Sequence, residues 1–168
     1  MQAVHEGGHV FGALLTGGEV SAVVLHPLTI SRTDLRSNPR PLFVVWAGPV
    51  TGVAAPLLVW AIIESVKLPF AFLARFFAGF CLIANGAYIT FGSLGRIGDC
   101  GEMLRHGSPL WQLWLFGALT IPLGFCLWHR QGVHFGLGKA NGNVNHHIAY
   151  CTLGLALSLV LIGLQFPG

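Results

Sequence analysis

The chain has 168 residues, of which 54% are hydrophobic, only 9% are charged and 23 are glycine. A soluble domain carries about a quarter of its residues as charged side chains, so this composition excludes a soluble globular protein and a disordered chain. The formal net charge is +3 and the basic residues form no contiguous run, which excludes a nucleic-acid partner. The remaining class is an integral membrane protein in contact with the lipid bilayer.

Apolar stretches long enough to cross a membrane follow one another along the chain. A helix needs about 20 apolar residues to cross the ~30 Å hydrocarbon core. One short segment, Met1 to Thr16, is followed by four long ones: Leu42 to Ser65, Phe70 to Leu94, Pro109 to Trp128 and Ile148 to Phe166. We therefore expect an all-α integral membrane protein with about five transmembrane helices, folded as a single polytopic domain over residues 1–168.

The first segment has only four residues before His5, so we expect its helix to be truncated at the N-terminus. After it, Glu19 to Ser31 carries β-branched residues in partial alternation, and the turn signal Asn38-Pro39 follows. This pattern favours a short strand or hairpin at the membrane surface.

Basic residues divide unequally between the two sides of the predicted membrane domain. One side carries Arg32, Arg36, Arg40, Arg96 and Arg105, and the other carries Lys67, Arg75, Arg130 and Lys139. The more basic side of a membrane protein faces the cytoplasm. We expect a plasma-membrane protein with the five-arginine side in the cytoplasm and the start of the chain outside.

An HExxH motif, His5-Glu6-Gly7-Gly8-His9, lies in the first apolar segment. On a helix, residues i and i+4 share a face, so both imidazoles can bind one metal ion while Glu6 accepts a proton from water beside it. A carboxylate at membrane depth costs at least ~2.5–3.5 kcal/mol, which indicates a function for Glu6. The motif predicts one Zn²⁺ per chain, with Glu6 as the catalytic base.

A catalytic zinc ion needs a third protein ligand. Asp99 follows the third long span, and the topology brings it to the same side of the membrane as His9. Glu102 is the second candidate, and both acids could instead be ordinary charged loop residues. We expect Asp99 to be the ligand.

Four features carry a family resemblance: HEGGH in the first apolar segment, the glycine-rich loop with strand character, AGPVTG at residues 47–52, and Gly98-Asp99 after a later span. Together, over about residues 4–109, they resemble the site-2 protease family of intramembrane zinc metalloproteases, especially its short members. The resemblance implies that His5, His9 and Asp99 bind zinc and that Glu6 activates water.

The same resemblance implies a metalloendopeptidase that hydrolyses membrane-embedded or juxtamembrane segments of other membrane proteins, at an active site towards the cytoplasmic side. A helical substrate segment must unwind before cleavage, and the strand expected within Glu19 to Ser31 could pair with it by edge addition. The substrate and the oligomeric state stay open.

Two positions depart from the family pattern. The family aspartate usually follows closely after an asparagine and a proline, whereas Asn85 lies fourteen residues before Asp99. Asn85 is therefore an auxiliary candidate at a spacing that differs from that of the family's oxyanion-donating asparagine. Gly52 stands where relatives often have an asparagine in AGPxxN.

Two other functions are compatible with parts of this sequence. A membrane di-iron oxidase or desaturase is suggested by eight histidines and the His146-His147 pair. Such enzymes need further HxxHH clusters, and residue 143 is asparagine. The other alternative is a catalytically inactive membrane scaffold.

Overall fold

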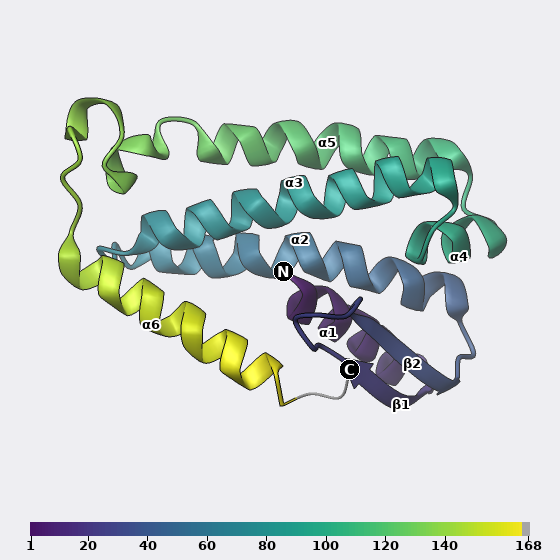
Figure 1. Ribbon diagram of the computed structural model, residues 1–168. Helices are drawn as coiled ribbons and strands as arrows, with labels where there is room; N and C mark the ends of the chain where they lie inside the picture. Colours follow the sequence, from purple (N-terminus) through teal and green to yellow (C-terminus); the bar gives the residue numbers. More distant parts are fainter. Residues whose placement is uncertain (166–168) are drawn as a thin grey trace.

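Six α-helices and a two-stranded sheet make up the computed structural model, which describes residues 1–165 (Figure 1). The helices are α1 (Gln2–Leu15), α2 (Pro41–Ser65), α3 (Ala71–Gly95), α4 (Asp99–Arg105), α5 (Leu110–Trp128) and α6 (His146–Gly163), and the strands are β1 (Glu19–Val24) and β2 (Arg32–Ser37). Two short 3-10 helices, Gln131–Phe135 and Gly138–Ala140, lie between α5 and α6. The predicted helical membrane fold with a surface strand after the first helix is confirmed.

Four of the helices, α2, α3, α5 and α6, are long and apolar enough to cross a membrane. They follow the predicted spans closely, except that α6 begins two residues before the expected Ile148. Its first turn is capped by the side chain of Asn145, which accepts the backbone N–H of Ile148 at 3.1 Å. The expected end of this span, Phe166, lies outside the described residues.

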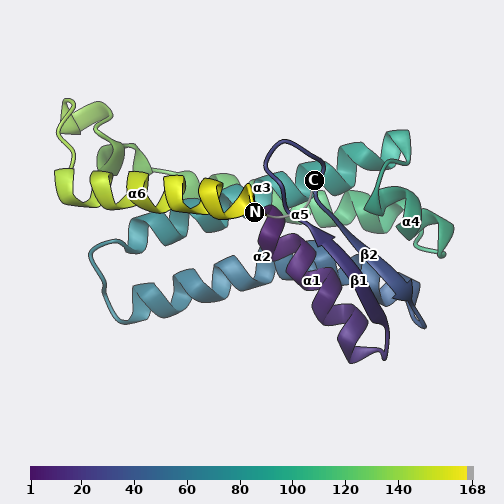
Figure 2. The same ribbon diagram turned by 60° about the horizontal axis from the view of Figure 1, so that its bottom comes forward.

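The helix that carries HExxH is shorter than the other spans. α1 has 14 residues, about 21 Å at 1.5 Å per residue, and packs along α2 beside the hairpin (Figure 2). The close approach depends on Gly8, because a Cβ there would collide with the carbonyl oxygen of Ala47 on α2. α1 is therefore held closely against α2, with the His9 ring directed at the start of that helix.

The three helices α2, α3 and α5 form the body of the molecule, with α3 between the other two (Figure 1). One buried cluster joins them to α4 and comprises Val45, Ile89, Cys100, Met103 and Leu113. A second, at the other end of α3, comprises Val53, Ala78, Leu82 and Leu127. The first cluster anchors α4 beneath α3 and so determines where Asp99 lies.

The short helix α4 was not predicted, because Asp99 was expected in a loop. Arg96 adopts φ 52° and Gly98 φ 56°, and these two left-handed residues reverse the chain between α3 and α4. Cys100 and Met103 are fully buried and hold the short helix in place. Asp99 is therefore the first residue of an anchored helix and faces α1.

The hairpin is antiparallel, with Val20 opposite Leu35 and Val23 opposite Thr33, and a bulge follows Val20. The strand predicted within Glu19 to Ser31 corresponds to β1. The second strand begins only at Arg32, after the expected segment. Alternating charges give β2 little apolar signal, which explains why the sequence pattern missed it.

Candidate metal centre

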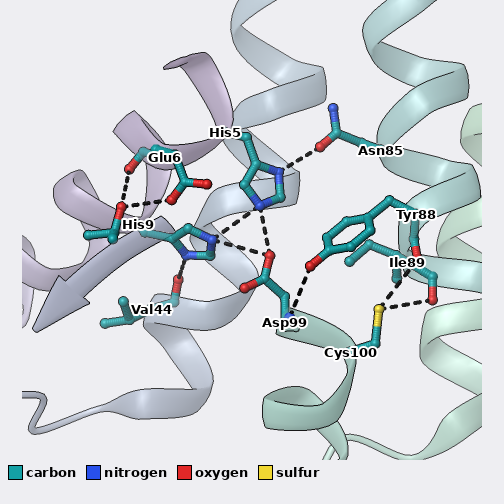
Figure 3. A network of polar contacts seen from close by, with 10 residues as sticks. His5, Glu6, His9, Val44, Asn85, Tyr88, Ile89, Asp99 and Cys100 are labelled. Carbon is teal, nitrogen blue, oxygen red and sulfur yellow. Dashed lines mark hydrogen bonds and ion pairs between the residues drawn. The ribbon is translucent and has the colours of Figure 1, made fainter. Parts of the chain in front are cut away.

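Three side chains from two distant parts of the chain converge at one point beside α1 (Figure 3). Asp99 Oδ2 lies 2.7 Å from His5 Nε2 and 3.3 Å from His9 Nε2, and the two Nε2 atoms are 3.1 Å apart. Four tetrahedral ligands about 2.0–2.1 Å from a zinc ion would lie about 3.3 Å from one another. The spacing of these three atoms fits one metal ion of that size.

Hydrogen bonds on the far side of each ring determine which ring nitrogen is free. His9 Nδ1 lies 2.9 Å from the carbonyl oxygen of Val44, which can only accept. His5 Nδ1 lies 2.8 Å from Asn85 Oδ1, and the Asn85 amide is oriented because its Nδ2 donates to the Cys81 carbonyl. Both Nδ1 atoms are therefore donors, so each neutral ring has its lone pair on Nε2.

When both rings are neutral, two imidazole lone pairs and a carboxylate oxygen therefore face one another with no hydrogen between them. Three acceptors at this separation repel one another unless a cation lies among them. Residues 1–165 contain one group of three or more side chains that could bind a metal ion together, namely His5, His9 and Asp99. The donor set of two nitrogens and one oxygen fits a catalytic zinc ion that keeps an open position.

The charge state of Asp99 agrees with this role. Burial by itself would raise the pKa of the Asp99 carboxyl, but hydrogen bonds and positive charge from protonated His5 and His9 outweigh burial and hold that pKa below its usual range. A metal cation at the same point would act on the carboxyl in the same direction. The carboxylate is the form that ligates a metal. The adjacent Cys100 is different, because burial raises the pKa of its thiol to about 11, so it stays protonated.

The middle residue of the motif, Glu6, lies beside the cluster. Its side chain is buried, at 4% exposure, and its Oε2 accepts a hydrogen bond of 2.8 Å from the hydroxyl of Thr33 on β2. Glu6 lines a cleft of about 560 Å³ together with His5, His9 and Asp99. The sequence predicted Glu6 next to the metal but contained no signal for Thr33.

The walls of this cleft come from α1, the hairpin, the start of α2, α3 and α4. The hairpin contributes Thr29 to Thr33 and Leu35. No residue of β1 lines the cleft. The sequence predicted that a strand within Glu19 to Ser31 would border the substrate site. In the structure the strand that borders the cleft is β2, which begins at Arg32.

The two auxiliary candidates occupy different places. Asn85 is fully buried and contacts Nδ1 of His5, on the opposite side of the ring from the point where the ligand atoms converge. It orients the imidazole and is not directed at the cleft as an oxyanion donor. Glu102 lies at the cleft wall but is paired with Arg105 at 3.1 Å and His106 at 3.3 Å, outside the cluster.

Glycines of the AGPVTG segment make room for these side chains. A Cβ on Gly48 would collide with the imidazole of His9. A Cβ on Gly52 would lie 2.8 Å from Asn85 Oδ1. The space beside Gly52 is filled by the amide of Asn85 from α3.

Tyr88 is a further residue that sequence reasoning missed. Its hydroxyl oxygen accepts the backbone N–H of Asp99 at 3.1 Å (Figure 3), and a Cβ on Gly98 would collide with that oxygen. Tyr88 follows Asn85 by three positions on α3, so helical spacing places both on one face. That spacing was the signal that could have identified it.

The histidines that could have formed a di-iron site lie elsewhere. His134 stacks on Phe72 with ring centroids 4.6 Å apart, at the opposite end of α3 from Asp99. His146 and His147 begin α6. These histidines do not join the cluster, and no second group of metal ligands exists in the described part of the chain.

Comparison with protein families gives one match. The model of the family described as Peptidase M50B-like matches residues 1–94, more than half of the chain. The matched region contains His5, Glu6, His9 and Asn85 and ends before Asp99. Comparisons with curated proteins and with solved structures give no match. The chain belongs to the Peptidase M50B-like family and is a membrane protein of the site-2 protease type.

Proposed function

We propose that the protein is a zinc-dependent intramembrane endopeptidase that cleaves membrane-embedded or juxtamembrane segments of other membrane proteins. The observation that carries this proposal is the convergence of three metal-ligating atoms, from His5, His9 and Asp99, in a cleft that also contains the buried carboxylate of Glu6. A structural metal site would not require an acid beside it.

His5, His9 and Asp99 would hold one zinc ion. Bound there, zinc would polarise the scissile carbonyl and acidify a water molecule. Asn85 and Val44 keep both imidazoles in the tautomer that presents Nε2 to the ion. Tyr88 fixes the backbone of Asp99, so each ligand is held by a second hydrogen bond.

Glu6 would act as the general base and then as the general acid. Its carboxylate takes the proton from the attacking water and passes it to the leaving amine nitrogen when the peptide C–N bond breaks. The buried position of Glu6 limits competing bulk water. Its Oε2 is bound by Thr33, which leaves Oε1 to exchange the proton.

The substrate would be extended at the point of cleavage, because a helical peptide has its backbone groups paired and shielded. β2 pairs with β1 along one edge, and its other edge has no strand partner among residues 1–165. Edge addition of the substrate to β2 would bring an extended segment into the cleft. Leu35→Pro should therefore reduce cleavage, and unchanged cleavage would exclude this mode of binding.

The cleft would open towards the cytoplasmic side of the plasma membrane. The hairpin, α4 and the ends of α2 and α3 near them lie together (Figure 1), and the connections on this side carry the five arginines of the positive-inside argument. Substrates would reach the cleft from the bilayer or its cytoplasmic surface.

The decisive experiment compares the full chain with Glu6→Gln and Glu102→Gln, purified in detergent, for metal content and for cleavage of a transmembrane-segment reporter. We expect one zinc per chain in all three proteins. Cleavage by Glu6→Gln should fall by about 10²-fold or more, while Glu102→Gln stays active. Equal cleavage by wild type and Glu6→Gln would exclude the protease, and two irons per chain would indicate an oxidase.

A further inference from the structure

Thr33 connects the hairpin to the proposed base. Its Oγ1 lies 2.8 Å from Glu6 Oε2 and 3.4 Å from the backbone carbonyl oxygen of Glu6. A hydroxyl has one hydrogen, and a good O–H···O bond is shorter than 3.0 Å, so the hydrogen is directed at the carboxylate. The hydroxyl donates to Glu6 across 27 positions of sequence.

Glu6 has few restraints of its own. Its carboxylate is buried, and within residues 1–165 Thr33 is the one side chain that donates a hydrogen bond to it. Without that bond no hydrogen bond from a described side chain would fix the terminal carboxylate torsion, whose intrinsic preference is shallow. With Oε2 occupied, Oε1 is the oxygen that remains available in the cleft.

Thr33 is itself held firmly. It is β-branched, which restricts its χ1 angle, and it pairs with Val23 in the hairpin register. Its neighbours Arg32 and Leu35 line the cleft with it. One residue thus belongs both to the strand that borders the cleft and to the hydrogen bond that orients Glu6.

We infer that Thr33 is a positioning residue, which orients the Glu6 carboxylate for proton transfer and couples that orientation to the strand on which the substrate docks. The inference rests on the proposed peptidase function. It predicts that the hydroxyl of Thr33 acts on the rate of the chemical step, because its one hydrogen is donated to the Glu6 carboxylate. Misplacing a catalytic group by about 1 Å can reduce a rate by about 10²-fold.

The test uses the full chain with bound zinc and a transmembrane-segment peptide as substrate. Thr33→Val keeps the shape and removes the hydroxyl, and Thr33→Ser keeps the hydroxyl. Ser21→Ala is the matched control, because Ser21 donates to the Asp34 carbonyl across the same hairpin at 3.0 Å and lies outside the cleft. Zinc content and melting temperature are measured for each protein, and Thr33→Ala provides a second hydroxyl-free variant.

We expect Thr33→Val and Thr33→Ala to lower kcat by about tenfold to a hundredfold, with KM within twofold of wild type and one zinc per chain. Thr33→Ser and Ser21→Ala should keep kcat within about threefold of wild type. Adding Thr33→Val to Glu6→Gln should cause no further loss, because the group that Thr33 positions is already disabled.

Different outcomes distinguish the two proposals. If wild type cleaves and Thr33→Val has the same kcat, or if Thr33→Ser is as impaired as Thr33→Val, the positioning role is wrong and the peptidase stands. A raised KM with unchanged kcat would likewise assign Thr33 to docking alone. If wild type does not cleave, or Glu6→Gln cleaves equally well, the peptidase fails and the positioning role fails with it.

Discussion

Asn85, in the middle of α3, accepts the Nδ1–H of His5 at 2.8 Å, although the two residues lie 80 positions apart in sequence. The amide can do so because its Nδ2 is occupied by the Cys81 carbonyl, which directs Oδ1 at the ring. This contact links the helix with the HExxH motif to the helix that leads to Asp99. It sets the tautomer of His5 and so determines which nitrogen faces the candidate metal centre.

Replacing Asn85 tests this relationship. Asn85→Leu removes the acceptor for His5, and we expect zinc affinity to fall by about 10–100-fold, as is typical when an outer partner of a ligating histidine is lost. Asn85→Asp keeps an acceptor for His5 and should retain more affinity than Asn85→Leu. Competition with a metal-binding dye measures both, and equal affinity in Asn85→Leu and wild type would contradict the orienting role.

Gly48→Ala should displace His9 from the centre. A Cβ at this position overlaps the His9 imidazole, and overpacking of this kind costs about 1–3 kcal/mol. If that cost falls on the metal-bound state, zinc affinity drops by about 5- to 150-fold. Gly154→Ala on α6 is the control, because a Cβ there meets nothing within 4 Å. Metal titration of both variants checks the expectation, which fails if Gly48→Ala binds zinc as wild type does.

Asp99 and Glu102 can be separated by their effect on zinc binding. Asp99→Ala removes one of the three converging atoms, and we expect a loss larger than the ~10–100-fold typical of an outer partner. Glu102→Ala should leave zinc affinity unchanged, because Glu102 is paired with Arg105 and His106 outside the cluster. Zinc content after dialysis gives the result, and the reverse ranking would transfer the ligand role to Glu102.

The orientation of the chain in the membrane is also testable. An epitope inserted after Arg36, in the hairpin, should be protected in intact cells, and one inserted after Lys139, between α5 and α6, should be accessible from outside. The expectation follows from the larger number of arginines on the hairpin side. Accessibility in the opposite pattern would place the cleft on the outer side.

Part of this structure was predictable from local sequence. The membrane spans follow from hydropathy, because the bilayer imposes a minimum length on any apolar helix that crosses it. The relation of His5, Glu6 and His9 is equally local, since the helical repeat puts residues i and i+4 on one face. β1 was predictable from its β-branched residues, whereas β2 carries too little apolar signal.

Which residues contact one another across the fold could be learned only from the tertiary structure. Asp99 is brought to the histidines by the left-handed turn at Arg96 and Gly98 and by the burial of Cys100, neither of which a charged loop sequence reveals. Glu102 is one helical turn further on and is directed elsewhere.

The sequence alone therefore determined the class of the protein, its spans and the three residues of its motif, because hydrophobic length and helical periodicity act over a few neighbouring residues. Only the tertiary structure placed Asp99 beside the two histidines and brought Asn85 and Thr33 into contact with the motif. Those contacts join segments 27 to 94 positions apart, and their energies depend on packing that no local pattern encodes.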